Sequence, residues 1–241
     1  MRVVRLKYAH SDPLFYRARV NVVSASNLES AQILLRGEAC CGFVPVTLAA
    51  KYKLPVVPRV AIYSDGPVIS SRLFRGSGEG YAAVDDTTVS ALALKIALGI
   101  DFVKVSAVDG ALSRYAGVLV IGDEALRLVD RGAPHIADVG EVWRSKVGTP
   151  LVYAVFAAAP GAPRRDVERA VEEVESSLLH FYENPAPVVE KAASRLGVSP
   201  RLVEAYYASV KYTVSPYVLR GLERQCSLMG LGELQLVEVD H

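Results

Sequence analysis

The chain has 241 residues, of which 51% are hydrophobic and 22% charged, so it is long enough for one large domain or for two lobes of about a hundred residues each. Twenty-seven basic residues stand against 26 acidic ones, which leaves a net charge of +1 with no basic stripe and no run of like charge. This composition excludes a disordered chain and argues against nucleic acid as a partner, and any anion must be bound by local groups.

The N-terminal residues predict a strand at 2–7 and no targeting segment. They are charged within the first few positions, and no run of about eighteen apolar residues follows, so we expect a cytoplasmic protein without a membrane partner. Three cysteines, two of them adjacent (Cys40 and Cys41), make neither a disulfide framework nor a metal site. The low number of Asn and Gln residues points to a thermophile as the source.

The first part of the chain alternates short apolar runs with helical segments. Strands are predicted at residues 2–7, 20–25, 40–46 and 56–63, and helices at 26–37 and 47–52. The glycines of a connector at residues 75–80 do not form GxGxxG and open no helix, which argues against a dinucleotide site.

The middle of the chain repeats a strand-then-helix rhythm, and the end is helical. Strands are predicted at residues 81–84, 101–105, 116–121 and 151–159, and helices at 89–98, 109–115, 125–129, 164–182, 187–196, 200–212 and 216–229. The rhythm of the middle part favours a parallel sheet with covering helices. The four C-terminal helices are separated by Pro-containing breaks.

The turn at residues 64–71, Ser-Asp-Gly-Pro-Val-Ile-Ser-Ser, is the first candidate site. Gly66 and Pro67 after an Asp predict a tight bend, from which backbone N–H groups and the hydroxyls of Ser70 and Ser71 project. Such a bend suits a small anion, and it serves equally well as a plain turn between two strands. The residues alone leave both interpretations open.

Three further places carry groups that fit a ligand site. His10 follows the first strand, at a position where open α/β sheets bind ligands. Thr87, Thr88 and Ser90 lie at a predicted helix start, which favours a carboxylate or a phosphate, although a plain N-cap explains the threonines as well. Asp123 begins another helix, where the N-cap interpretation is the more economical one.

These groups are hydroxyls, backbone donors and helix N-termini at the ends of strands. They predict a cleft for a small carboxylated molecule between two lobes, without a cofactor. The sequence contains no metal-ligand spacing, no P-loop and no GxSxG motif.

Several ordered stretches of residues 1–160 resemble the chorismate dehydratase (MqnA-type) family of the futalosine route to menaquinone. They are YAHSDPL at 8–14, FVPV at 43–46, SDGPVIS at 64–70, LVIGDEALR at 119–127, ADVGEVW at 137–143 and GTPLVYAVFAA at 148–158. The resemblance implies an α/β, two-lobed fold of the periplasmic-binding-protein type (type II), with a ligand cleft between the lobes and a helical C-terminal part. One lobe would comprise residues 1–83 and 152–241, and the other residues 84–151.

The resemblance also implies an activity, that of a carbon–oxygen hydro-lyase that removes water from chorismate to give 3-[(1-carboxyvinyl)oxy]benzoate without a metal or another cofactor. Ser70 matches a family serine, and His10 stands where the family usually has an asparagine important for activity; these two are the expected catalytic residues. The expected substrate-binding residues are Ser11, Gly66, Ser71, Thr87, Thr88, Ser90 and Asp123. The arginine of the family's Ser-Arg-Thr-Ser segment is absent near Ser90. Chorismate is the expected small-molecule partner, and a homodimer is left open.

Two alternatives remain. The first is the sister enzyme 1,4-dihydroxy-6-naphthoate synthase, which shares the fold and whose paired threonines resemble Thr87 and Thr88. The second is a non-catalytic cytoplasmic solute-binding protein for a small carboxylate.

Overall fold

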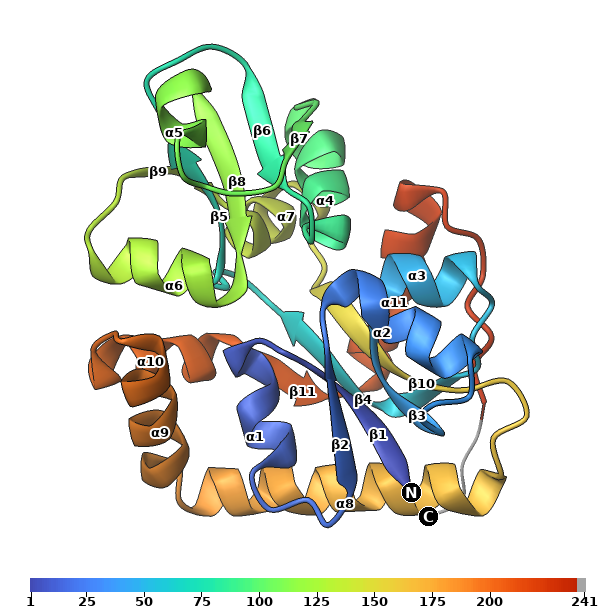
Figure 1. Ribbon diagram of the computed structural model, residues 1–241. Coiled ribbons are helices and arrows are strands. Elements are labelled where there is room, and N and C mark those ends of the chain that lie inside the picture. The colour runs from blue at the N-terminus through green and yellow to red at the C-terminus, as the bar shows by residue number, and fades with distance from the viewer. Residues whose placement is uncertain (238–241) are drawn as a thin grey trace.

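The computed structural model describes residues 1–237, whose strands form two sheets (Figure 1). The first sheet has six strands in the order β11-β4-β10-β3-β1-β2 and the second has five in the order β7-β6-β8-β5-β9. The first contains β1 (Arg2–Leu6), β2 (Asn21–Ala25), β3 (Cys41–Pro45), β4 (Val56–Ser64), β10 (Leu151–Ala158) and β11 (Lys211–Thr213). The second contains β5 (Ser71–Arg75), β6 (Tyr81–Val84), β7 (Val103–Val105), β8 (Gly117–Ile121) and β9 (His135–Asp138).

Both sheets mix parallel and antiparallel pairs. β1 runs parallel to β2 and β3, and β6 runs parallel to β7 and β8, as the strand-then-helix rhythm predicts. β10 is antiparallel to both β3 and β4, and β5 is antiparallel to both β8 and β9. β5 of the second sheet follows β4 of the first in the chain, and β10 of the first sheet follows β9 of the second. These two antiparallel strands are therefore the points at which the chain passes from one sheet to the other.

Helices cover both sheets, and the buried apolar residues form three clusters. On the first sheet they are α1 (Asp12–Phe15), α2 (Asn27–Leu35), α3 (Val46–Lys51), α8 (Arg164–Glu183), α9 (Ala186–Leu196), α10 (Pro200–Ser209) and α11 (Pro216–Met229), and on the second α4 (Thr88–Leu98), α5 (Ala111–Arg114), α6 (Gly122–Asp130) and α7 (Val139–Val147). One cluster joins residues of both sheets, among them Val44, Leu73, Leu119, Trp143 and Leu151. This shared core fixes one sheet against the other.

The sheets divide the chain differently from the lobe boundary expected at residues 83 and 84. Residues 71–75 and 81–84 pair with β8 in the second sheet, because hydrogen bonding there satisfies the backbone of both strands. We therefore propose a division that follows the sheets, with its crossings at residues 65–70 and 148–150.

The end of α10 differs from the predicted helix at residues 200–212. α10 ends at Ser209, and residues 211–213 form the edge strand β11 against β4. Tyr212 alternates with exposed neighbours, is 1% exposed, and its hydroxyl donates to the carbonyl oxygen of His10 at 2.9 Å. A tertiary contact thus overrides the helical pattern here. Among residues 1–237, no helix is both long and apolar enough to cross a membrane.

Candidate functional site

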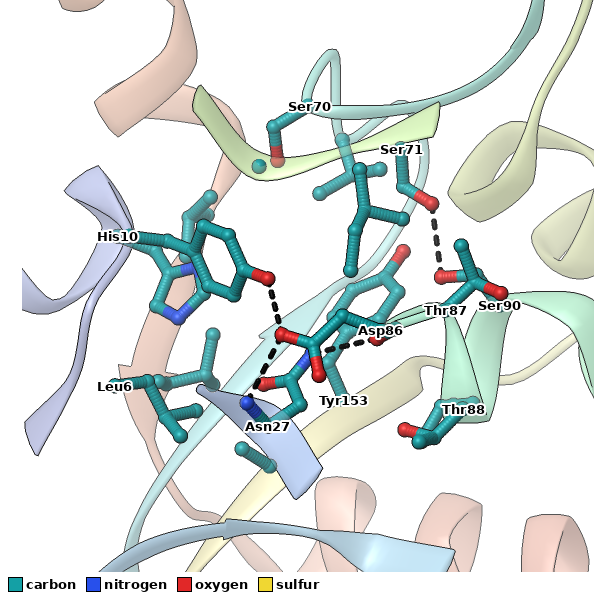
Figure 2. Close-up of a pocket in the computed structure, with 18 of the residues that line it drawn as sticks. Leu6, His10, Asn27, Ser70, Ser71, Asp86, Thr87, Thr88, Ser90 and Tyr153 are labelled. Carbon is teal, nitrogen blue, oxygen red and sulfur yellow. Dashed lines mark hydrogen bonds between the residues drawn. The ribbon is translucent and has the colours of Figure 1, made fainter. Parts of the chain in front are cut away.

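A small cavity of about 50 Å³ lies where the two sheets meet (Figure 2). Its walls come from β1, β4, β5, β8 and β10, from the loops after β1 and β6, from the 64–71 turn, from α10, and from the starts of α2, α4 and α6. The lining residues are Leu6, Tyr8, His10, Asn27, Ile62, Val68, Ser70, Ser71, Asp86, Thr87, Thr88, Val89, Ser90, Ile121, Gly122, Tyr153, Ala154, Tyr206 and Val210. Eight of them carry a hydroxyl group, and Asp86 is the one carboxylate among these lining residues.

Six of the nine residues expected at the site line this cavity. They are His10, Ser70, Ser71, Thr87, Thr88 and Ser90. The other three, Ser11, Gly66 and Asp123, are not among its lining residues. Ser11 is fully buried, and its hydroxyl has no hydrogen-bond partner within residues 1–237.

The turn at residues 64–71 binds an anion, and that anion is the protein's own Asp138. The backbone N–H groups of Val68 and Ile69 each donate to one oxygen of its carboxylate at 2.9 Å. The N–H of Gly140 donates at 3.1 Å, and Arg72 Nε donates at 3.1 Å. Asp138 is 1% exposed, so these donors replace its hydration. The N–H groups of Val68 and Ile69 are therefore not available to a substrate, which corrects the anion-cradle interpretation for these two groups.

Ser70 and Ser71 leave this turn in different directions. The Ser70 carbonyl accepts from Gly122 N–H at 2.7 Å, and its side chain lines the cavity together with Tyr206. Ser71 Oγ donates to Ser90 Oγ at 2.8 Å, which ties β5 to the first turn of α4. The two hydroxyls therefore lie on separate walls of the cavity (Figure 2).

The start of α4 faces the cavity without a side-chain cap. Thr87 Oγ1 donates to the carbonyl oxygen of Val84 at 2.9 Å and does not accept from the helix. Thr87 is thus the N-cap residue of α4 by position, as predicted, but its hydroxyl closes the preceding turn and does not cap the helix. Backbone N–H groups of an uncapped first turn favour a negative charge.

His10 lies in a short 3₁₀ turn (Ala9–Ser11) directly after β1, with its ring 5.6 Å from the ring of Tyr8. Its Nε2 atom is buried and has no hydrogen-bond partner within residues 1–237. Burial lowers the pKa of His10 from 6.5 to about 4, the nearby Asp12 opposing this shift and Arg5 adding to it. The imidazole is thus neutral at pH 7 and can donate or accept one hydrogen bond at each nitrogen.

Replacing His10 with Asn is expected to make the folded protein less sensitive to acid. Because the folded pKa lies below the unfolded one, only the unfolded chain takes up a proton at His10 as the pH falls from about 6.5 to about 4, and stability is lost over this range. Urea unfolding at a series of pH values measures the effect. His135→Asn, at an exposed histidine of β9, is the control and should retain the wild-type pH profile.

A hydrogen-bonded group at Asp86 crosses from the second sheet to the first. Its carboxylate accepts from the hydroxyl of Tyr8, from Asn27 N–H at 3.0 Å and from Leu28 N–H at 3.1 Å. The Asn27 side chain in turn donates to the Asp86 carbonyl at 2.9 Å (Figure 2). Asp86 is absent from the residues expected at the site, because no local pattern around it indicates a partner 59 residues away.

Gly122 allows the ring of Tyr8 to approach the start of α6. Its φ is +66°, and a Cβ there would lie 2.3 Å from Tyr8 Cδ1. Gly122→Ala is expected to lower the free energy of unfolding by about 1–3 kcal/mol, since the ring must move and the backbone is strained. Chemical denaturation measures this loss. Gly132→Ala is matched in backbone strain (φ +72°) with open space around the added atom, so a loss as large as that of Gly122→Ala would contradict the role of Tyr8.

Asp123 joins α6 to the loop after β1 instead of lining the cavity. It accepts from Ala9 N–H at 2.8 Å and from Arg195 at 2.9 Å. Arg195 also donates to Asp12 at 2.9 Å, so a single guanidinium on α9 connects α6 to α1. The carboxylate oxygens of Asp123 are thus occupied by protein donors, which accounts for the position of Asp123 outside the cavity lining.

Within the part of the chain that the structure describes, no group of three or more His, Cys, Asp or Glu side chains is arranged to hold a metal ion.

A family model described as menaquinone biosynthesis matches residues 1–229. A curated protein of Thermus thermophilus named chorismate dehydratase is 28% identical over 256 aligned residues, with 93% of each chain covered.

Solved structures resemble the fold at lower identity. A protein of Archaeoglobus fulgidus gives a TM-score of 0.73 at 19% identity, covering 96% of this chain and 98% of its own. A Candida albicans protein described as exhibiting the generic periplasmic binding protein fold gives 0.72 at 12% identity, covering 96% and 89%. The alkanesulfonate-binding protein SsuA of Xanthomonas axonopodis pv. citri, bound to MOPS, gives 0.69 at 15% identity, covering 98% and 94%. These likenesses confirm the expected two-lobed α/β fold.

Proposed function

The chain belongs to the menaquinone-biosynthesis family, and on that premise we propose that it is a chorismate dehydratase. The reaction removes the ring hydroxyl and a ring proton of chorismate as water and gives 3-[(1-carboxyvinyl)oxy]benzoate, which makes the protein a hydro-lyase of the futalosine route. The observation that carries the proposal is the cavity itself. The cavity is lined by Ser70, which matches a family serine, and by His10, which stands where the family usually has an asparagine, among neutral hydroxyl donors.

The elimination requires few catalytic groups from the protein. Loss of water makes the ring aromatic, so the product is strongly favoured, and the enzyme has to hold the ring and assist departure of the hydroxyl. Ser70 is well placed to donate to the substrate from the end of the 64–71 turn, where Asp138 fixes the backbone before it. His10, neutral at pH 7, supplies an unpartnered nitrogen that can donate to the leaving hydroxyl.

We assign the removal of the ring proton to the enolpyruvyl carboxylate of the substrate. Asp86 is the carboxylate that lines the cavity, and it already accepts from Tyr8, Asn27 and Leu28. Its oxygens are therefore already engaged by protein donors. The uncapped start of α4, with Thr88 and Ser90, would bind the other carboxylate of chorismate.

The cavity must enlarge before chorismate binds. A volume of about 50 Å³ has room for about two water molecules, which is far less than a ring with two carboxylates requires. We therefore propose that the substrate is admitted when the loops after β1 and β6 separate.

The direct test is to incubate the purified protein with chorismate and to follow 3-[(1-carboxyvinyl)oxy]benzoate by chromatography. Formation of this product supports the proposal. Tight binding of chorismate without dehydration would contradict it and favour a solute-binding protein. Conversion of the precursor of 1,4-dihydroxy-6-naphthoate, with chorismate left unchanged, would favour the sister enzyme, for which the pair Thr87 and Thr88 is the relevant feature.

A further inference from the structure

A second hollow adjoins the inner cavity and shares a wall with it. This outer groove has a volume of about 700 Å³ and lies between the loop after β1, the loop after β6 and the start of α6. Tyr8, Asp86 and Ile121 line both the groove and the inner cavity. Because the Tyr8 hydroxyl donates to the Asp86 carboxylate, these two side chains close the wall between the two hollows.

The wall is held from both sheets. Tyr8 follows β1 of the first sheet, and Asp86 follows β6 of the second. Asp86 also accepts from the N–H groups of Asn27 and Leu28 at the start of α2, again in the first sheet's half. Its carboxylate is thus bound by three donors across the boundary between the sheets, and opening the wall must break these contacts together.

The charges around the wall oppose an anionic substrate. The outer groove carries the carboxylates of Asp85, Asp86, Asp109, Asp123 and Glu124, against the cations of Lys7 and Arg127. Asp123 is paired with Arg195, and Glu124 with Arg127, so the groove retains an excess of negative charge. A ligand with two carboxylates that passes Asp86 meets a like charge at close range.

We propose that Asp86 is a specificity-determining gate residue, whose carboxylate closes the way from the outer groove to Ser70 and must leave the N–H groups of Asn27 and Leu28 before a dianionic substrate can enter. This inference rests on the proposed function, since chorismate supplies the two carboxylates. A closed form that has to open first reduces the apparent affinity by the fraction of open molecules. Weakening the gate therefore speeds association.

The kinetic test is stopped-flow association of chorismate with the full chain. Asp86→Ser shortens and neutralises the side chain and is expected to raise the association rate about tenfold. Tyr8→Phe removes one of the three donors and gives a smaller rise. Asp85→Ser is the matched control, because Asp85 is exposed, lies next to Asp86 and lines the groove but not the cavity; its rate should stay within about twofold of the wild type.

A second measurement needs no substrate. In a Ser90→Cys background, the rate at which the neutral reagent methyl methanethiosulfonate modifies position 90 reports access to the inner cavity. Because Cys40, Cys41 and Cys226 are also present, the modified residue is identified by peptide mass. Asp86→Ser is expected to accelerate labelling of position 90 about tenfold, and Asp85→Ser to leave it unchanged. Asp86→Asn, which keeps the side-chain volume, repeats the measurement should the serine variant fold poorly.

The two measurements separate the gate from the activity. Faster labelling together with no chorismate binding in any variant would retain the gate and overturn the dehydratase proposal. Labelling that is unchanged in Asp86→Ser and Asp86→Asn would overturn the gate, whatever chorismate does. Slower chorismate association with unchanged labelling would also overturn it, and would make Asp86 part of the binding surface.

Discussion

Asp138→Ala is expected to lower the free energy of unfolding by about 3–5 kcal/mol, because it removes one partner of a buried ion pair. The loss leaves Arg72 and the N–H groups of Val68, Ile69 and Gly140 without their acceptor in a place that is closed to water. Urea unfolding followed by circular dichroism measures the change.

Two further variants test the cause of this loss. Asp138→Asn keeps the shape and one acceptor oxygen, so it should retain part of the stability. Asp101→Ala removes an exposed carboxylate paired with Lys95 at 2.5 Å, and it should cost less than about 1 kcal/mol. If Asp138→Ala proved no more destabilising than Asp101→Ala, the assignment of Asp138 as the anchor of the 64–71 turn would be wrong.

Ser70→Ala is expected to reduce kcat/KM for chorismate by about ten- to a thousandfold if its hydroxyl donates to charge that develops in the transition state. Steady-state kinetics on the purified variant measures the loss. A fall confined to kcat would assign the hydrogen bond to the transition state, whereas a rise confined to KM would assign it to substrate binding.

The kinetic loss must be separated from a loss of structure. Ser70 is only 6% exposed, so the variant's unfolding curve is recorded alongside its kinetics. Ser77→Ala, at an exposed serine of the connector after β5, is the control and should keep wild-type kinetics. Unchanged kinetics in Ser70→Ala would return this residue to a structural role in the turn.

The sequence predicts most elements of the fold because their local signals are strong. The helix at residues 26–37 carries its own start signal, and the structure shows Ser26 and Glu29 as reciprocal caps of α2. β9 was not predicted, since His135–Asp138 is too short to show an alternation of apolar and polar residues, and half of the strand is exposed. Its place at the sheet edge depends on pairing with β5, which is a long-range contact.

The hydroxyl groups that line the candidate site were expected from the sequence, whereas the roles of the carboxylates Asp138 and Asp86 were not. Ser70, Ser71 and Ser90 stand in recognisable turn and helix-start patterns, so their position at one cavity could be anticipated. Asp138 has the sequence signature of an N-cap followed by Glu141, and it does cap α7. Its second task, holding a turn about 70 residues earlier in the chain, follows only from the tertiary fold. The same applies to Asp86, whose three donors come from distant segments.

The place of β10 in the first sheet has a consequence for the order of folding on the ribosome. β10 lies between β3 and β4, although it follows them by about a hundred residues in the chain. Until residues 151–158 leave the exit tunnel, β3 and β4 lack their common neighbour and expose unpaired backbone edges. Residues 71–138 supply all strands of the second sheet in one continuous segment. We therefore expect residues 71–138 to acquire protease resistance first in stalled nascent chains. The strands of the first sheet should become resistant only after β10 has emerged.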